Sequence, residues 1–382
     1  MSDLDVILYG ATGFTGKQTA RYFAAHAPAG LRWAVAGRDP ARLEEIAADT
    51  NATAVVVADA GDPAAVDAMV GRARVLLTTA GPYAKYGSAV VDACVRRGVD
   101  YVDITGEVPW VEEQIARHHE AAAARGTRIV PFCGFDSVPS DVGTLLLVEQ
   151  LRARGQAAGA VSASFKMKGG LNGGTLDSAL TMAERGQLDA VGLERPRWDA
   201  VRRTWLVPFV MSAINTRVVA RSAALAAAAG QGYGDRFHYE ELMETGSRRG
   251  AWLTTGALGL LSAATRLRSG RALARRFGPK PGAGPSEADM DAGFFRTRLL
   301  AQPLMATLEF AGDPGNRFTV TSLCESALLL ARARDRLPGG AGRGGVLTPA
   351  TALGLPLLDR LRERGLKVTV AELDHSAVDS PA

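Results

Sequence analysis

The chain has 382 residues, which exceeds one ordinary domain, and its 47% hydrophobic and 22% charged residues are typical of a globular protein. Its 44 lysines and arginines barely outnumber its 40 aspartates and glutamates, so composition does not favour nucleic acid as a partner. The three cysteines are odd in number and far apart, which argues against a disulfide framework or a metal site and favours the reducing cytoplasm.

The first predicted element is a buried strand at 4–9, so we expect no signal peptide before it. A glycine-rich turn and a helix at 16–26 follow this strand. Glycines at 10, 13 and 16 give the spacing GxxGxxG, a variant of the dinucleotide-binding fingerprint. The amides at the start of the helix would hold the pyrophosphate. We predict cofactor contacts from Gly10, Thr12, Gly13, Phe14, Thr15 and Gly16.

The second predicted strand, at 31–36, ends close to Arg38. An acidic residue at this position would bind the ribose hydroxyl of NAD, whereas an arginine accommodates the 2′-phosphate of NADP. Arg42 follows one helical turn later. Arg38 therefore favours NADP(H) over NAD(H). The alternative is that Arg38 is a solvated loop residue and Asp39 is only a helix cap.

Strands and helices continue to alternate up to about residue 132. The apolar runs predict strands at 54–58, 74–79, 100–104 and 127–132, with helices at 40–49, 63–72, 86–97 and 110–125. Such an alternation predicts a parallel, doubly wound sheet with right-handed crossovers. The sequence thus predicts an α/β Rossmann domain over residues 1–138.

Ligands of open parallel sheets bind at the carboxyl ends of the strands. Ala80, Gly81 and Pro82 follow the fourth predicted strand and should line the nicotinamide-ribose side. Asp59 ends the third strand, where it either approaches the adenine or simply starts a loop. Both positions belong to the predicted cofactor site.

The rest of the chain has a different pattern. It predicts a helix at 140–154 capped by Ser140 or Asp141, a strand at 160–168, a glycine-rich turn at 169–175 and a helix from about residue 177. Residues 196–282 show poor periodicity, and 278–285 form a break. Strands at 293–310 and 317–322 and helices at 323–334 and 349–365 follow. We predict an inserted α+β domain at 139–345, for substrate or dimerisation, and a segment at 346–382 whose helix returns to the first domain before a tail.

The longest uncharged apolar run, at 251–265, is too short to span a membrane. Arg248 and Arg249 precede it, and a basic segment follows it. One interpretation is a buried element followed by a solvated basic helix. The other is a surface that makes peripheral contact with an anionic leaflet of the plasma membrane.

Four residues are candidates for proton donation or substrate orientation, namely Tyr83, Tyr86, Asp136 and Ser137. Tyr83 lies beside the predicted nicotinamide pocket, and a phenol can protonate an enolate. Asp136 and Ser137 follow the sixth strand at the same carboxyl edge. The alternative is that these residues are structural. Tyr83 would then be a half-buried tyrosine beside a turn, and Asp136 and Ser137 would form hydrogen bonds with turn amides.

A series of motifs, in order along nearly the whole chain, resembles the saccharopine dehydrogenase-like oxidoreductases, in particular their trans-acting enoyl reductase branch. The motifs are VILYGATGFTGK at 6–17, AGR at 36–38, TTAGPYAKYG at 78–87, CVRRGVDYVDITGE at 94–107, CGFDSVPSD at 133–141, GGTLDS at 173–178, GPSE at 284–287, GDPGN at 312–316 and GGVLTPA at 344–350.

This resemblance implies a Rossmann domain, an inserted α+β domain and a nicotinamide cofactor. It further implies reduction of carbon–carbon double bonds in hydrophobic acyl chains that a separate polyketide synthase carries, during lipid or glycolipid assembly. Two alternatives stay open, namely a saccharopine-type dehydrogenase of amino acids or imines and a non-catalytic NADP-binding scaffold at membranes. The apolar second domain is also compatible with a homodimer interface.

Overall fold

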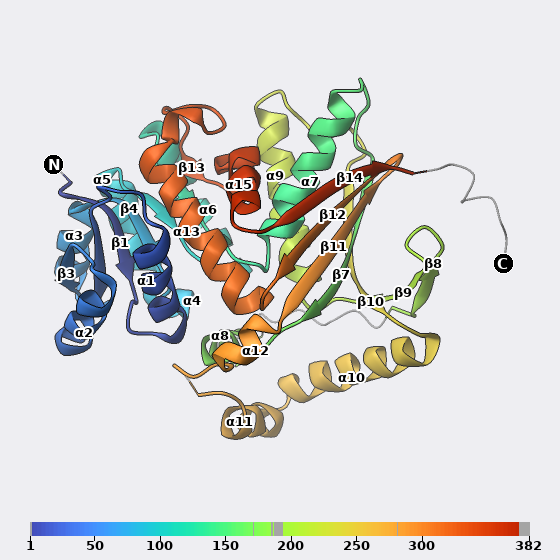
Figure 1. The fold of residues 1–382 in the computed structure, drawn as a ribbon, viewed down its shortest axis with the longest axis horizontal. Coiled ribbons are helices and arrows are strands. Elements are labelled where there is room, and N and C mark those ends of the chain that lie inside the picture. Colours follow the sequence, from blue (N-terminus) through green and yellow to red (C-terminus); the bar gives the residue numbers. More distant parts are fainter. Residues whose placement is uncertain (1, 171, 185, 187–193, 281, 374–382) are drawn as a thin grey trace.

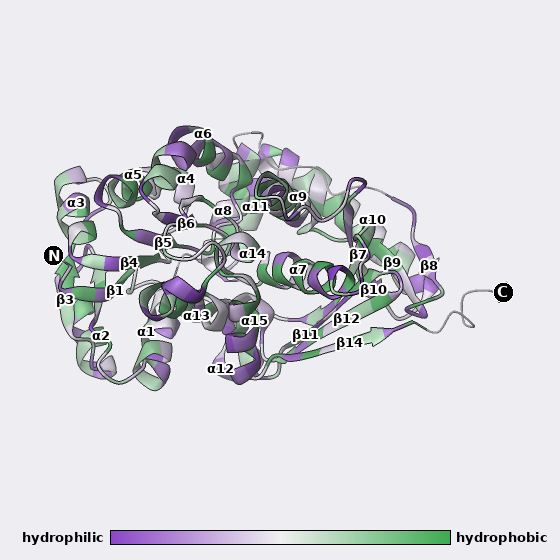
Figure 2. Cartoon of the chain, turned by 90° about the horizontal axis from the view of Figure 1, so that it is seen from above, coloured by the Kyte–Doolittle hydropathy of each residue, from purple (hydrophilic) through white to green (hydrophobic). Residues whose placement is uncertain are grey.

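The computed structural model describes residues 2–170, 172–184, 186, 194–280 and 282–373 (Figure 1). Leu171, within the predicted glycine-rich turn, and residues 374–382, at the end of the predicted segment 346–382, lie outside the described residues. The described chain forms two seven-stranded sheets. Figure 2 shows one sheet at each end of the molecule, with helices between them.

The first sheet is parallel throughout and has the order β13-β6-β5-β4-β1-β2-β3. Its strands are β1 (Leu4–Tyr9), β2 (Trp33–Gly37), β3 (Ala54–Val57), β4 (Ala73–Thr78), β5 (Asp100–Val102), β6 (Arg128–Val130) and β13 (Gly345–Val346). Its crossover helices are α1 (Phe14–His26), α2 (Pro40–Thr50), α3 (Pro63–Gly71), α4 (Tyr83–Tyr86), α5 (Ser88–Arg97) and α6 (Val108–Ala124). The predicted doubly wound Rossmann sheet is confirmed.

The second sheet is mixed and has the order β14-β12-β11-β7-β10-β9-β8. Its strands are β7 (Ala160–Lys168), β8 (Arg197–Asp199), β9 (Thr204–Pro208), β10 (His238–Thr245), β11 (Phe294–Ala301), β12 (Leu304–Ala311) and β14 (Lys367–Glu372). The helices of this part are α7 (Val138–Arg152), α8 (Gly173–Glu184), α9 (Ser212–Ala228), α10 (Arg248–Arg266), α11 (Arg268–Phe277) and α12 (Glu287–Asp291). The predicted second domain of α+β type is confirmed.

Three local predictions were wrong. Residues 317–322, predicted as a strand, belong to a π-helical turn (Pro314–Phe318) and to α13 (Thr319–Arg332), which is buried almost all round and therefore lacks a polar face. The helix predicted at 349–365 is two helices, α14 (Pro349–Ala352) and α15 (Gly354–Glu363), because Gly354 has a φ of +62°. Ser140 and Asp141 do not cap α7, which begins at Val138 with both side chains buried inside it.

An aromatic cluster joins the two sheets. Phe135 follows β6 in the first sheet, and its ring centroid lies 4.9 Å from that of Phe295 on β11. Phe165 on β7 and Phe318 also contact this ring in edge-to-face geometry, the arrangement that aromatic pairs favour. The loop at the carboxyl end of β6 is thereby anchored in the core of the second domain.

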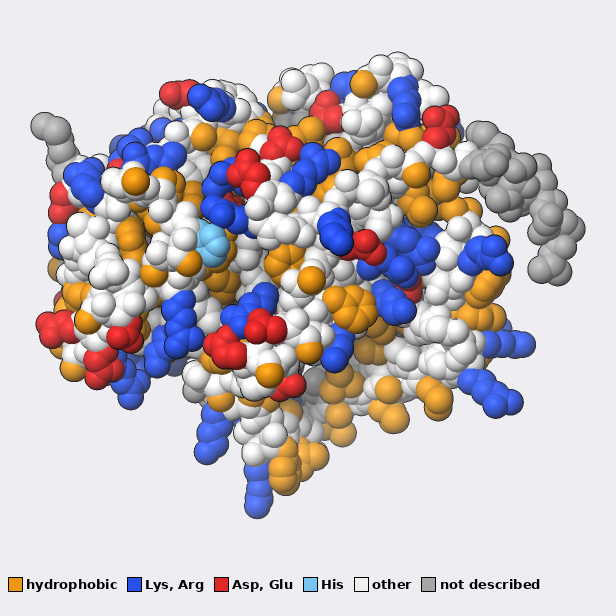
Figure 3. All heavy atoms as spheres, viewed as in Figure 1, with side chains coloured by type: hydrophobic (Ala, Val, Ile, Leu, Met, Phe, Trp, Pro, Cys, Tyr) orange, Lys and Arg blue, Asp and Glu red, His pale blue; other side chains and the backbone are white. Residues whose placement is uncertain are grey.

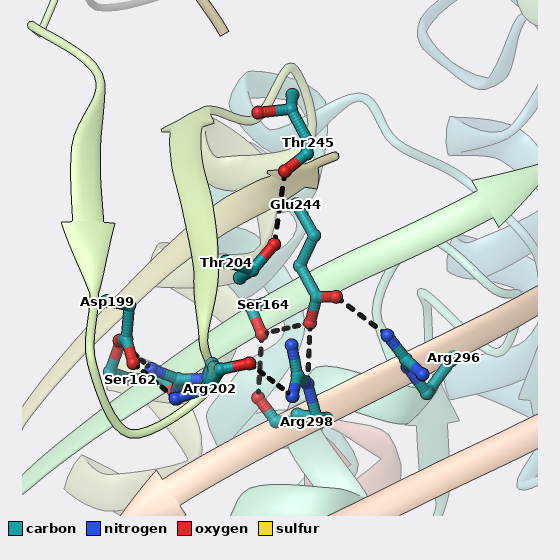
Figure 4. A network of polar contacts seen from close by, with 9 residues as sticks. All are labelled: Ser162, Ser164, Asp199, Arg202, Thr204, Glu244, Thr245, Arg296 and Arg298. Atoms are coloured by element: carbon teal, nitrogen blue, oxygen red, sulfur yellow. Dashed lines mark hydrogen bonds and ion pairs between the residues drawn. The ribbon is translucent and has the colours of Figure 1, made fainter. Parts of the chain in front are cut away.

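The second sheet also contains a polar network centred on Glu244 of β10 (Figure 4). The buried carboxylate accepts hydrogen bonds from Ser164 of β7 at 2.8 Å, from Arg298 of β11 at 2.8 Å and from Arg296 of β11 at 2.9 Å. Arg298 also donates to the Arg202 carbonyl. Burial opposes ionisation, but the hydrogen bonds from Arg298 and Ser164 hold the pKa of Glu244 below its ordinary value. One carboxylate thus joins three strands.

We expect Glu244→Gln to lower the free energy of unfolding by about 2–3 kcal/mol, because it leaves two partly buried guanidinium groups without their anion. Since the pKa of Glu244 is lowered in the folded state, this stabilisation is present above pH 4.5 and is lost as the pH falls below it. Urea unfolding at several pH values would measure both effects.

Glu240→Gln is the matched control, because Glu240 lies on the same strand and pairs with Arg197 at the exposed surface. Such a surface pair contributes about 0–1 kcal/mol. Equal destabilisation by the two variants would contradict a central role for Glu244.

Candidate functional site

The glycine-rich turn between β1 and α1 is packed too closely for side chains. Gly10 has a φ of +87°, and a Cβ on it would lie 2.8 Å from the Ala80 backbone nitrogen. A Cβ on Gly16 would lie 2.2 Å from the Gly10 carbonyl oxygen. These two glycines therefore allow the end of β1, the residue Ala80 after β4 and the start of α1 to lie in contact.

The start of α1 suits a phosphate. Its N-cap is Gly13, no side chain caps the helix, and its first turn contains no acidic residue. The first amides and the positive end of the helix dipole are thus available to an anion. Thr12, Phe14 and Thr15 are half-buried around this turn. The Phe14 ring also packs against Gly284, where a Cβ would lie 2.3 Å from the ring. These residues fit the pyrophosphate of a dinucleotide.

Arg38 is exposed just after β2, at the predicted adenosine end of the site. Its charge acts on Tyr9 and on Lys85, a second cation that the sequence analysis had not singled out. Hydrogen bonding to Tyr86 raises the pKa of the Lys85 ammonium, and Arg38 opposes this rise. Asp59 is exposed nearby and accepts a hydrogen bond from the Gly61 amide at 2.7 Å. Arg38 and Lys85 thus lie close enough for their charges to interact, and both are cations of the kind that bind phosphate groups.

The turn after β4 is held by Glu107, which follows β5. The buried Glu107 carboxylate accepts hydrogen bonds from the Tyr83 amide at 2.9 Å and the Ala84 amide at 2.8 Å. It also accepts one from Ser178 of α8 at 3.0 Å. Residues 80–82 are therefore positioned from both domains, with α8 lying over Gly81, where a Cβ would be 3.9 Å from the Ser178 hydroxyl.

Tyr83 is buried beneath this turn, with 4% of its surface exposed. Its hydroxyl donates to the Thr78 carbonyl at 3.1 Å and accepts from the Ile104 amide at 3.4 Å. Burial raises the pKa of this phenol well above its ordinary value. This geometry favours the structural interpretation, in which the hydroxyl joins the ends of β4 and β5. The catalytic role of Tyr83 stays an untested prediction.

Asp136 differs from the other acidic residues at this edge. It is half-buried after β6, and no group of the described chain donates a hydrogen bond to its carboxylate. One carboxylate oxygen lies 4.0 Å from the place of a Cβ on Gly106, beside Ile214 of α9. Burial raises its pKa to about 6. An unpaired carboxyl group with this pKa can hold a proton near neutral pH.

Ser137 belongs to a buried network behind Asp136. Its hydroxyl donates to the Asn215 side-chain oxygen at 3.0 Å, and the Asn215 amide donates to Glu241 at 2.7 Å. Ser140 and Tyr239 also donate to Glu241, at 3.0 and 2.8 Å. Burial raises the pKa of Glu241 to about 7. Ser137 is thus a link between α7, α9 and β10.

The structure brings the predicted cofactor residues together along the carboxyl edge of the first sheet, with Asp136 and Ser137 at the same edge. Tyr83 lies at that edge, but its side chain is buried beneath the turn after β4. Sequence reasoning missed the second-domain residues that complete the surroundings, namely Ser178, Asn215 and Glu241. Ser178 lies in the GGTLDS motif at 173–178, whereas Asn215 and Glu241 lie in none of the motifs.

A cavity of about 580 Å³ lies at the opposite, amino edge of the first sheet. Arginines line it, but they are already paired. Arg96 contacts Asp67 at 2.8 Å, and Arg334 contacts Asp100 at 3.1 Å. The cavity is therefore less suited to the cofactor than the carboxyl edge is.

Comparison with known proteins agrees with this geometry. Residues 6–130 match the family model of the saccharopine dehydrogenase NADP binding domain. The chain is 35% identical to a trans-acting enoyl reductase of Mycobacterium tuberculosis and 35% identical to that of Mycobacterium leprae. Each alignment covers 97% of this chain and 98% of the relative.

Among solved structures, apo saccharopine dehydrogenase (L-Glu forming) from Saccharomyces cerevisiae has a similar fold. The superposition covers 96% of this chain and 100% of that chain, with a TM-score of 0.56 and 12% sequence identity. This likeness extends to both domains and shows the fold alone.

We expect Arg38→Ala to weaken NADPH binding about 10- to 100-fold, because it removes a charge-assisted contact to the 2′-phosphate. NADH binding should change little, since NADH lacks that phosphate. Titration of both nucleotides by fluorescence would measure the preference.

Arg42→Ala provides the control, because Arg42 already pairs with Asp39 at 3.4 Å. Its NADPH affinity should stay close to that of the wild type. An unchanged preference for NADPH in Arg38→Ala would refute the proposed phosphate contact.

Proposed function

The chain belongs to the saccharopine dehydrogenase-like oxidoreductases, in the trans-acting enoyl reductase branch, and we propose that it reduces the carbon–carbon double bond of an enoyl thioester. It is an NADP(H)-dependent oxidoreductase. The observation that carries the proposal is the collinear similarity to trans-acting enoyl reductases over 97% of the chain. We further propose that the acyl chain belongs to lipid or glycolipid biosynthesis and that a separate polyketide synthase carries it.

Bound NADPH supplies a hydride, so the protein must orient the acyl chain and deliver one proton. Residues 10–16 would hold the pyrophosphate, and Arg38 with Lys85 would hold the 2′-phosphate. The turn at 80–82 would position the nicotinamide end, because Glu107 and Ser178 support it from two sides. Hydride addition at the β carbon leaves negative charge on the α carbon and the thioester oxygen, and this charge needs a proton.

Asp136 is the proton donor that the geometry favours. Its carboxyl group follows β6 at the edge where the cofactor would bind, and it has no competing hydrogen bond within the described residues. The buried network from Ser137 to Glu241 holds the adjacent backbone, so Ser137 acts as a positioning residue. A thioester that displaces water from this region would favour the neutral acid further.

The turns beside α8 support an uncharged substrate rather than an amino acid. Asp313 is already engaged by the amides of Gly170 and Asn316, and the Asn172 side chain donates to that of Asn316 at 3.0 Å. A saccharopine-type substrate would need free cations and carboxylates to bind its charged groups. These turns offer mainly satisfied polar groups and glycine backbone.

We expect Asp136→Asn to lower the rate of NADPH-dependent enoyl thioester reduction about 10²- to 10⁴-fold, the usual contribution of a positioned acid. In the wild type, kcat/KM should fall about tenfold per pH unit above pH 6, because only the protonated form donates. The variant should lose this pH dependence. NADPH oxidation with a crotonyl or longer enoyl thioester would measure both.

Asp59→Asn is the control, since Asp59 is an exposed carboxylate at the same sheet edge. It should retain the wild-type pH profile. A wild-type rate and profile in Asp136→Asn would assign proton delivery to another group. Oxidation of NADPH with imines but not with enoyl thioesters would refute the proposed reaction.

A further inference from the structure

Helices α10 and α11 project from the body of the protein. Only Ala251 and Thr255 of α10 are buried, and α11 has no buried residue. In Figure 1 the two helices lie along the lower margin, below the second sheet, and Figure 3 shows orange apolar side chains and projecting blue cations along the same margin. The interpretation of residues 251–265 as a buried element was therefore wrong.

The large apolar side chains exposed on these helices form what we term the apolar face. On α10 the exposed positions recur at intervals of one helical turn, as they do on one side of an amphipathic helix. The large side chains of the face are exposed by half or more: Trp252 (51%), Leu253 (75%), Leu260 (75%), Leu261 (59%), Leu267 (60%), Leu273 (59%) and Phe277 (75%). Soluble proteins seldom expose so many large apolar side chains together without a binding role.

The charged residues of the segment that carries this face have one sign. Residues 245–286 contain no aspartate or glutamate but carry the cations Arg248, Arg249, Arg266, Arg268, Arg271, Arg275, Arg276 and Lys280. Arg275 pairs with Glu184 of α8, whereas Arg276 lies over the Phe277 ring at 5.7 Å. Arg268 makes no ion pair within the described residues. The partner of the face should therefore be anionic as well as apolar.

We propose that α10 and α11 bind the surface of an anionic lipid bilayer. An interfacial helix places its apolar side chains among the acyl chains and its cations against lipid phosphates, and tryptophan favours that depth. A second copy of the chain fits less well, because a two-fold interface would place the same cations opposite one another. A fluid bilayer can also bind two helices that project from the molecule without having a complementary shape.

The membrane contact is peripheral. Within the described residues, no helix is long and apolar enough to cross a bilayer. Gly278 at the end of α11 packs against α8, where a Cβ would lie 2.3 Å from a methyl carbon of Leu176. Ser178 of α8 in turn donates to Glu107, so α8 connects the exposed helices to the turn after β4. The proposal itself does not depend on the reaction.

Vesicle flotation of the full chain tests this proposal. We expect binding to phosphatidylcholine vesicles that contain 30% phosphatidylglycerol, and much weaker binding to pure phosphatidylcholine or at 0.5 M salt. Arg268→Gln combined with Arg276→Gln should weaken binding roughly 30-fold, at about fivefold for each cation removed. Leu260→Ser combined with Leu261→Ser should weaken it at least about tenfold. Trp252 fluorescence should shift to the blue on binding.

Two variants outside the apolar face serve as controls. Val57→Ser alters a side chain of similar exposure (53%) on β3, and Arg154→Gln removes an exposed cation after α7. Both should bind vesicles like the wild type.

Any of three results would overturn the proposal. The first is equal binding to neutral and anionic vesicles. The second is a protein that does not bind vesicles but forms a dimer in light scattering, if Leu260→Ser combined with Leu261→Ser dissociates that dimer. The third is no vesicle binding together with binding of an acidic acyl carrier domain that these variants abolish.

Discussion

Phe135 connects the two halves of the protein, and the geometry of the candidate site depends on this contact. The residue leaves the carboxyl edge of the first sheet, and its ring enters the aromatic core of the second, 4.9 Å from Phe295. The next two residues, Asp136 and Ser137, are therefore held at the junction of the domains. A ring of this size buries a large apolar area, which resists separation of the domains.

The same junction contains carboxyl groups that are surrounded by neutral donors. Burial raises the pKa of Asp103, Asp141 and Glu241 to about 7 in each case. Hydroxyl and amide groups donate hydrogen bonds to these carboxyl groups. Glu241, for example, accepts hydrogen bonds from Ser140, Tyr239 and Asn215. Glu244 is different, because two arginines lower its pKa. The buried ion pairs of Glu244 thus lie within the second sheet, while Asp103, Asp141 and Glu241 are acids that can be neutral near pH 7.

The amino-terminal half could be predicted well because its signals are local. Each strand of the first sheet, β13 apart, is a short apolar run, and Gly10 and Gly16 are required by backbone contacts within one βα unit. The carboxyl-edge rule then placed residues 80–82 and 136–137 together.

In contrast, α13 is buried almost all round, so it shows no helical periodicity and its first residues resembled a strand. Strand β13 has only two residues and depends on pairing with β6. Ser178 and Asn215 join the site only through tertiary contacts, which local patterns do not reveal.

Helix α8 connects the proposed substrate side to the exposed helices, and it is held loosely. Of its residues only Gly173 and Leu180 are buried, whereas α13 on the cofactor side is buried along nearly its whole length. Its contacts reach both neighbours: Ser178 donates to Glu107 at 3.0 Å, and Leu176 packs against Gly278. Segments with few buried contacts open at low free-energy cost. A displacement of α10 and α11 would therefore be transmitted to α8, and through Ser178 and Glu107 to the turn after β4, more readily than to the glycine-rich turn between β1 and α1.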